Sequence, residues 1–172
     1  MASVRRQAPD PFSAAVAMLA RRAYSVAELR QALRRKMLDV TTVEDTLARL
    51  KKLGFLDDRR FAEEYASSLV RNRAFGRYRV QRELKSRGLA ERYIKPALEQ
   101  AFGETDEPAL LEQVLDRKMR ALRLPLTRAR FYSLCQSLRR QGFRSEDIIR
   151  VVRARPELAP VADEMELDRL ED

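Results

Sequence analysis

Apolar residues recur every three or four positions along most of the chain, and each run is bounded by residues that begin or end helices. Residues at this spacing share one face of an α-helix, so the pattern predicts a series of short amphipathic helices. Ser25 and Glu28 have the spacing of a capping box, Thr41 and Glu44 are expected to form another, and Thr105 is expected to cap a later helix. Ala, Leu, Arg and Glu dominate the composition, which also favours helices over sheets. The predicted fold class is therefore all-α.

The helical pattern occurs three times. Leu29, Val80 and Leu134 occupy equivalent places, 51 and then 54 residues apart. Repetition at such a period is typical of a tandem array whose units contact mainly their neighbours. We predict three three-helix repeats in an elongated, curved molecule: a flexible arm over residues 1–10, repeats over 11–56, 57–103 and 104–155, and a disordered acidic tail over 156–172.

One helix is expected to organise the basic surface of the molecule. Gly76 and Gly88 bound it, and Val80 and Leu84 form a narrow apolar seam on one face. Eight arginines and lysines lie between Arg71 and Arg92, against only two glutamates. Cations three and four positions apart repel one another unless an anion approaches, so this face is expected to bind a partner. The predicted contact residues, including equivalents in the outer repeats, are Arg71, Arg73, Arg77, Tyr78, Arg79, Arg82, Lys85, Arg87, Arg34, Arg35, Lys36, Arg139 and Arg140.

Composition narrows the kind of partner. The formal charge is +9 and the pI is about 10.2, which favours a polyanion such as nucleic acid, or an acidic groove on a protein. Tyr78 lies at the end of the basic face and is expected either to stack on a base or partner side chain or to pack in the core.

Catalytic chemistry has little basis in the sequence. The chain has no histidine and one cysteine, Cys135, which excludes disulfides, zinc fingers and imidazole-based nucleophile pairs. Adjacent carboxylates such as Asp57 and Asp58 point in different directions on a helix and are explained by capping or by solvent exposure. We therefore expect no enzyme activity, no cofactor and no metal. Cys135 is expected to pack as a small buried hydrophobe.

The ends of the chain and its apolar content suggest where the protein works. No apolar run approaches the roughly 20 residues needed to cross a bilayer, and the start has no signal-peptide core. We expect a soluble, cytoplasmic monomer. The last seventeen residues contain seven acidic residues and a single arginine, Arg169, so the tail could fold over the basic face.

Three consecutive segments resemble the motifs of the bacterial RecX family. They are Tyr24–Leu29 (YSVAEL), Leu53–Ala62 (LGFLDDRRFA), and Phe75–Gly88, in which Phe75-Gly76, Arg79-Val80, Glu83-Leu84 and Arg87-Gly88 carry the likeness. The helical pattern extends the resemblance from about Pro11 to Arg155. The sequence departs from the family pattern at Met37, where glycine is usual, and in its acidic tail.

The resemblance implies a regulator, mainly an inhibitor, of the RecA recombinase. Such a protein is built from tandem three-helix repeats and lies in the groove of the RecA filament on single-stranded DNA. It restrains ATP hydrolysis, strand exchange and the coprotease activity behind the SOS response. Single-stranded DNA is then a partner with RecA, and duplex DNA is a further candidate. Two alternatives stay open: a sequence-nonspecific DNA-binding repeat protein that acts without RecA, and a helix-turn-helix regulator.

Overall fold

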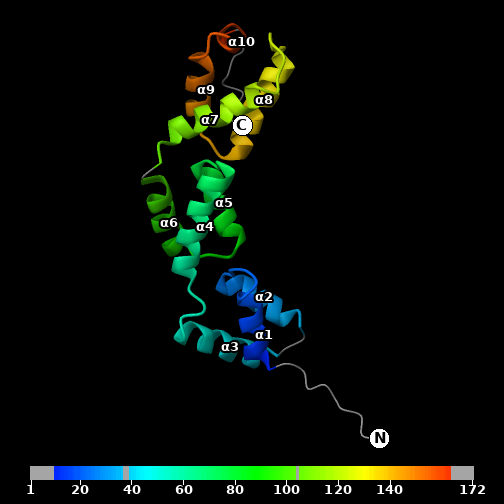
Figure 1. The fold of residues 1–172 in the computed structure, drawn as a ribbon, viewed down its shortest axis with the longest axis vertical. Helices are drawn as coiled ribbons and strands as arrows, with labels where there is room; N and C mark the ends of the chain where they lie inside the picture. The colour runs from blue at the N-terminus through cyan, green and yellow to red at the C-terminus, as the bar shows by residue number, and fades with distance from the viewer. Residues whose placement is uncertain (1–9, 37–38, 104, 164–172) are drawn as a thin grey trace, which may run out of the picture.

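Helices alone form the regular structure of the residues described in the computed structural model, which are residues 10–36, 39–103 and 105–163. The helices follow one another as Pro11–Leu19 (α1), Val26–Arg34 (α2), Val40–Lys52 (α3), Asp58–Arg73 (α4), Arg77–Ser86 (α5), Glu91–Gly103 (α6), Glu107–Met119 (α7), Arg128–Gln141 (α8), Ser145–Arg153 (α9) and Ala159–Asp163 (α10). They stack as three successive units along one long axis, with the first unit at the bottom of Figure 1. The predicted all-α class and elongated tandem array are confirmed.

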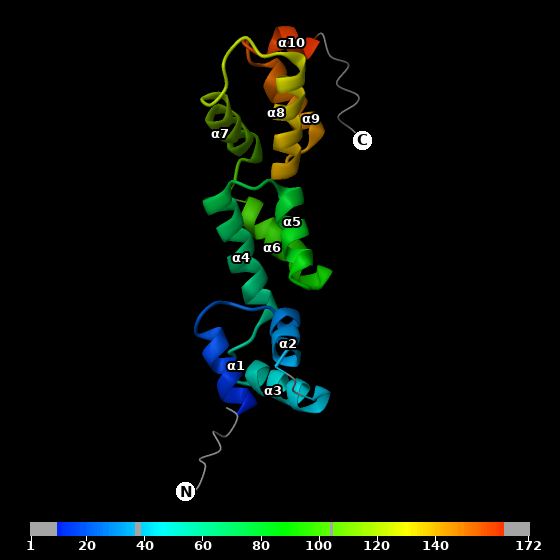
Figure 2. The same cartoon turned by 90° about the vertical axis from the view of Figure 1, so that its right-hand side faces the viewer.

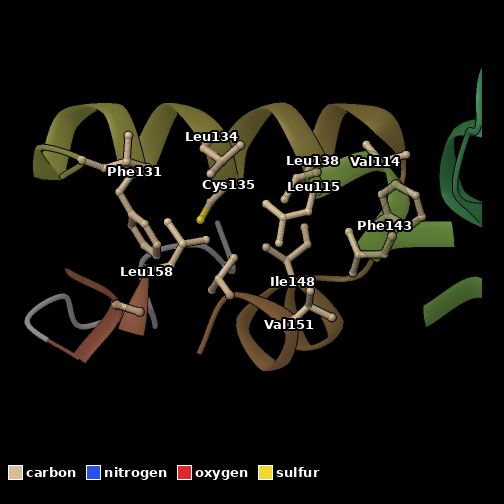
Figure 3. Close-up of a cluster of buried hydrophobic side chains, with 14 residues drawn as sticks. Val114, Leu115, Phe131, Leu134, Cys135, Leu138, Phe143, Ile148, Val151 and Leu158 are labelled. Atoms are coloured by element: carbon tan, nitrogen blue, oxygen red, sulfur yellow. The ribbon is translucent and has the colours of Figure 1, made fainter. Parts of the chain in front are cut away.

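Each unit buries its own apolar cluster. The first cluster lies among α1–α3 around Leu29 and Leu33, and the second lies among α4–α6 around Val80 and Leu84. The third contains Phe131 and Leu138 of α8 together with side chains of the helices around it (Figure 3). Full burial of one such side chain stabilises the fold by about 1.5–3 kcal/mol. The buried clusters are separate, so each unit has its own core, while the half-buried Leu110 of α7 packs against both the second and the third cluster.

Several helix ends follow the sequence signals. The Ser25 hydroxyl accepts from the Glu28 N–H at 3.1 Å, and the Glu28 carboxylate accepts from the Ser25 N–H at 3.1 Å, which completes the predicted capping box. Asp57 caps α4 by accepting from the N–H groups of Arg59 and Arg60. These contacts satisfy backbone donors that the first turn of a helix leaves unpaired.

Two predicted caps are wrong. Helix α3 begins at Val40, and its cap is Asp39, whose carboxylate accepts from the Thr42 N–H, so Thr41 lies inside the helix. Helix α7 is capped by Asp106, while the Thr105 hydroxyl donates to the Ala101 carbonyl at the end of α6. In both places an aspartate one or two residues from the predicted threonine takes the position, because its carboxylate accepts from the N–H three residues further along the chain.

Two helices end earlier than their apolar patterns suggest. The second was expected to run to about Met37, but α2 ends at Arg34, and Met37 lies outside the described residues. The third repeat's first helix was expected to include Leu122, but α7 ends at Met119, and Leu122 packs against the third cluster from the following turn.

The third core extends past the predicted boundary at Arg155. Leu158 and Ala162, from the segment assigned to the acidic tail, are fully buried in the third cluster. Short helix α10 places Ala162 there, beside α9 in Figure 1. Pro156 follows the end of α9, and Pro160 lies in the first turn of α10, so neither proline ends the folded unit. The rest of the expected tail, residues 164–172, lies outside the described residues.

Candidate functional site

The second helices of the three units form a column, with α8 above α5 and α5 above α2 in both Figure 1 and Figure 2. At the upper joint, the Gly76 N–H donates to the Gln141 carbonyl at 3.0 Å, and the Tyr78 N–H donates to the Gly142 carbonyl at 3.2 Å. At the lower joint, the Ser25 hydroxyl donates to the Arg87 carbonyl at 2.5 Å. The C-terminal end of each helix thus meets the N-terminal end of the next, where carbonyl groups satisfy open donors.

Close approach at the two joints requires glycine. Gly88 has φ +74°, and a Cβ there would lie 2.5 Å from the Ala27 Cβ. Gly142 has φ +101°, and a Cβ there would lie 2.4 Å from the Arg79 N atom. These two glycines are equivalent in the repeat, 54 residues apart. Each one ends a second helix and lets the neighbouring unit dock against the turn.

The lower joint uses Arg87, which the sequence predicted as a contact for a partner. One guanidinium nitrogen, Nη1, lies 2.6 Å from the Glu28 Oε1, and Nη2 donates to the Tyr65 hydroxyl at 2.9 Å. The same guanidinium lies 4.8 Å from the centre of the Tyr65 ring. In addition, the Val26 N–H donates to the Asp58 carboxylate at 2.8 Å. Arg87 is therefore a half-buried link between the first two units.

The upper joint uses Arg79 and Arg77. Arg79 pairs with Glu83 at 2.8 Å, donates to the Arg140 carbonyl at 3.2 Å, and lies 4.9 Å from the Phe75 ring centre. The Arg77 N–H donates to Glu107 at 2.9 Å, while its guanidinium lies 5.0 Å from the Phe102 ring centre. The expected repulsion along the basic helix is thus relieved within the protein. A role for these two residues in partner binding stays a prediction.

Most of the other predicted contact residues are exposed. Lys85 pairs with Glu91 at 3.4 Å, and Arg34 pairs with Glu44 at 3.6 Å, both with about half of their side-chain surface open. The remaining exposed cations form no ion pair with any residue that the structure describes: Arg35, Lys36, Arg71, Arg73, Arg82 and Arg140. Exposed ion pairs contribute little to stability, so Lys85 and Arg34 can exchange their partners for an external anion. The unpaired cations are open to such an anion directly.

Three of these cations are equivalent in the repeat. Arg34, Lys85 and Arg139 are separated by 51 and 54 residues, and each follows the buried leucine of its second helix. Arg34 and Lys85 are exposed, and Arg139 is half-buried. The column therefore carries a cation at the same helical position in every unit.

Arg30, also on α2, forms a bidentate ion pair with Glu44 of α3. Its Nε and Nη2 atoms lie 2.7 Å and 3.0 Å from the two carboxylate oxygens. The hydrogen bond from Arg30 lowers the pKa of Glu44 below its ordinary value of 4.5. This ion pair links α2 to α3 within the first unit, next to the exposed cations.

A hollow of about 570 Å³ opens at the upper joint. It is lined by Tyr78, Arg139, Phe143, Arg144, Ser145 and Glu146. Tyr78 is 53% exposed, which excludes the packing interpretation, and the Arg144 guanidinium lies 5.8 Å from the centre of its ring. Arg144 is not among the residues predicted from the sequence, although it lies two residues after Gly142, the repeat equivalent of Gly88.

The adjacent carboxylates have structural partners. Asp57 caps α4, Asp58 accepts from the Val26 N–H, and Glu63 pairs with Arg59 at 3.0 Å. Across the described ranges, no group of three or more acidic or cysteine side chains could hold a metal ion, and no helix is long and apolar enough to cross a membrane. Cys135 is fully buried, and burial raises the pKa of its thiol to about 11.

The fold and this surface define a class: an all-helical tandem repeat protein whose stacked helices carry a repeated set of cations. Comparison with known proteins gives the family. The model described as "RecX, first three-helix domain" matches residues 12–50, and that described as "RecX, second three-helix domain" matches residues 57–98. The chain belongs to the RecX family of regulatory proteins.

Individual members of the RecX family are similar to this chain over most of its length. Regulatory protein RecX of Trichlorobacter lovleyi is 30% identical over 145 residues, which cover 84% of this chain and 94% of that protein. Regulatory protein RecX of Halorhodospira halophila is 36% identical over 135 residues, covering 78% and 81%. The crystal structure of RecX from Lactobacillus salivarius superposes with a TM-score of 0.67 at 18% identity, over 91% of this chain and 95% of that one, which supports the fold.

Proposed function

We propose that this protein regulates the RecA recombinase, mainly as an inhibitor, by lying along the RecA filament on single-stranded DNA. In this proposal it restrains ATP hydrolysis, strand exchange and the coprotease activity behind the SOS response. Membership of the RecX family supports a regulatory role, and the basic surface supports an anionic partner.

The observation that carries the proposal is the repetition of Arg34, Lys85 and Arg139 along the column of second helices. A filament presents the same groups at regular intervals, so a repeat protein can contact several successive sites at once. Once one unit is bound, the others bind at a high effective concentration, and modest contacts give tight binding overall. Electrostatic attraction also speeds the first encounter.

The test is DNA-dependent ATP hydrolysis by the host's RecA, with this protein titrated well below one per RecA protomer and with DNA in excess. We expect strong inhibition, because one bound molecule spans several filament sites. Inhibition that requires saturation of the DNA would contradict the proposal and would leave the alternative, a DNA-binding repeat protein that acts without RecA.

The surface is tested by a matched pair of triple variants. Arg34→Gln, Lys85→Gln and Arg139→Gln together remove the repeated cations. Lys52→Gln, Lys95→Gln and Arg117→Gln remove one exposed cation per unit from α3, α6 and α7 instead, with the same change of net charge. We expect the first set to weaken inhibition and flatten its salt dependence, and the second to change both much less. Equal effects would show that only net charge matters.

Arg79, another predicted contact residue, is left unchanged in these variants. Because Arg79 links α5 to the Arg140 carbonyl of α8 and pairs with Glu83 within α5, its loss would disturb the joint as well as the surface. Arg82 is exposed and forms no ion pair among the described residues, so Arg82→Gln is the cleaner addition to the first set.

A further inference from the structure

The two joints of the column have the same design but different surfaces. Tyr78 and Arg144 at the upper joint are equivalent to Ala27 and Ala90 at the lower joint, 51 and 54 residues earlier. The lower joint docks through Gly88 with a methyl group at each of these positions. Docking of one unit on the next therefore requires neither an aromatic ring nor a guanidinium at these two positions. The exposed tyrosine and arginine of the upper joint call for another explanation.

The hollow at the upper joint holds these side chains in place. The Tyr78 N–H bonds to the Gly142 carbonyl, which fixes the backbone that carries the ring, while half of the residue's surface stays open to solvent. Phe143 is 3% exposed and forms a rigid wall from the third core. Arg139 and Arg144 line the hollow as cations, and Glu146 lines it as the one carboxylate, so the lining carries a net positive charge.

This combination suits one unpaired nucleotide. A flat ring open on the surface provides a platform on which a base of any sequence can stack, and guanidinium groups beside it match the charge and geometry of a phosphate. A volume of about 570 Å³ lies in the range of small-ligand sites. A paired base has both faces covered by its neighbours in the duplex, so the platform favours single strands.

We propose that this hollow is a subsite for one unpaired nucleotide of single-stranded nucleic acid, with its base on Tyr78 and its phosphate at Arg144 and Arg139. The subsite rests on the proposed function for its place on the surface that faces the filament. It adds to that function a contact with the strand itself. The test of the subsite uses DNA without RecA, so the subsite and the proposed function can fail separately.

The double variant Tyr78→Ala with Arg144→Ala gives the upper joint the residues that the lower joint already has, and is therefore expected to fold normally. Tyr78→Phe keeps the ring and removes the hydroxyl. Tyr132→Ala is the matched control, because Tyr132 is another exposed tyrosine near the opposite end of α8. Circular dichroism would check that each variant is folded.

Two measurements locate the base. A fluorescent oligothymidylate of about 15 nucleotides is bound in parallel with an otherwise identical abasic strand, and affinity is measured by anisotropy. We expect the wild type to prefer the strand with bases by at least about fivefold, and the double variant to lose that preference. Tyr78→Phe and Tyr132→Ala should keep it. In the second measurement, 5-iodouracil in the strand should crosslink to the peptide that contains Tyr78.

The opposite results are equally clear. Equal affinity for the two strands, or crosslinks confined to other peptides, would overturn the subsite. If the double variant bound DNA normally but lost inhibition of RecA, the hollow would instead bind an acidic protein segment, and the nucleotide proposal would be wrong while the regulatory one stood. A double variant that still preferred the strand with bases over the abasic strand would also refute the nucleotide subsite. If the wild-type protein failed to inhibit RecA but kept its preference for the strand with bases, only the proposed function would be refuted.

Discussion

Gly142 and Arg79 come from different units and touch: a Cβ atom placed on Gly142 would lie 2.4 Å from both the N and Cβ atoms of Arg79. The contact works because Gly142 has no side chain and adopts φ +101° at the end of α8. The turn that ends one helix is thereby also the surface on which the next unit docks. Local backbone conformation and long-range assembly depend on the same residue.

Gly142→Ala is expected to disrupt the upper joint. It adds the steric cost of the left-handed conformation, roughly 1–2 kcal/mol, and a clash that only a shift of α5 or α8 can relieve. Gly54→Ala is the matched control, because Gly54 has φ +73° with nothing within 4 Å of a Cβ, so it should carry the conformational cost alone. Hydrogen exchange at the N–H groups of Gly76 and Tyr78 and urea unfolding would compare the two. Equal destabilisation would contradict a docking role.

Acid should weaken the first unit through Glu44. Because Arg30 lowers the pKa of Glu44 in the folded state, the pair stabilises the fold above the ordinary carboxyl pKa of 4.5 and loses that effect as pH falls through the lower folded value. Glu44→Gln should therefore destabilise the protein near neutral pH and make progressively less difference in acid. The measurement is urea unfolding of both proteins at several pH values. A difference that is independent of pH would show that the charge does not matter.

The Cys135 thiol should resist modification in the folded protein. Its sulfur points from α8 into the third cluster (Figure 3), and burial raises its pKa to about 11, so very little reactive thiolate exists near neutral pH. Alkylation should be slow in native conditions and fast in urea. The native rate then reports opening of the third core. Rapid native alkylation would mean that this core opens readily.

Two truncations should separate the folded part of the C-terminal segment from its charge. A chain that ends at Arg155 loses Leu158 and Ala162, both fully buried, and the loss of one such leucine side chain typically costs about 2–5 kcal/mol. A chain that ends at Asp163 keeps them. We expect the shorter chain to lose stability in the third unit and the longer one to keep it, as measured by thermal unfolding and Cys135 alkylation. Equal stability would place the boundary back at Arg155.

The same truncation at Asp163 tests the expectation that the acidic tail competes for the basic face. Removal of residues 164–172 removes five of the seven acidic residues of the segment and Arg169. If the tail competes, inhibition of RecA and DNA binding should both strengthen, most clearly at low salt where charge interactions are least screened. No change at any salt concentration would show that the tail does not compete.

The sequence by itself determined the helices, their order and the threefold repeat. Helical periodicity and capping depend on residues three or four positions apart, as in Ser25 with Glu28, so they can be recognised without a structure. The same local chemistry identified Gly76 and Gly88 as the bounds of α5. It misplaced the starts of α3 and α7 because aspartate and threonine both cap helices, and only the backbone path selects between neighbours.

Only the tertiary structure decided which basic residues are open to a partner. Arg87 meets Glu28 from 59 positions away, and Arg79 meets the Arg140 carbonyl from 61, so no local pattern could show that these cations serve the joints while Arg82 and Lys85 face solvent. The hollow between Tyr78 and Arg144 likewise exists only once α8 docks on α5. Charge is a property of the sequence, but the availability of a charge depends on what the folded chain brings beside it.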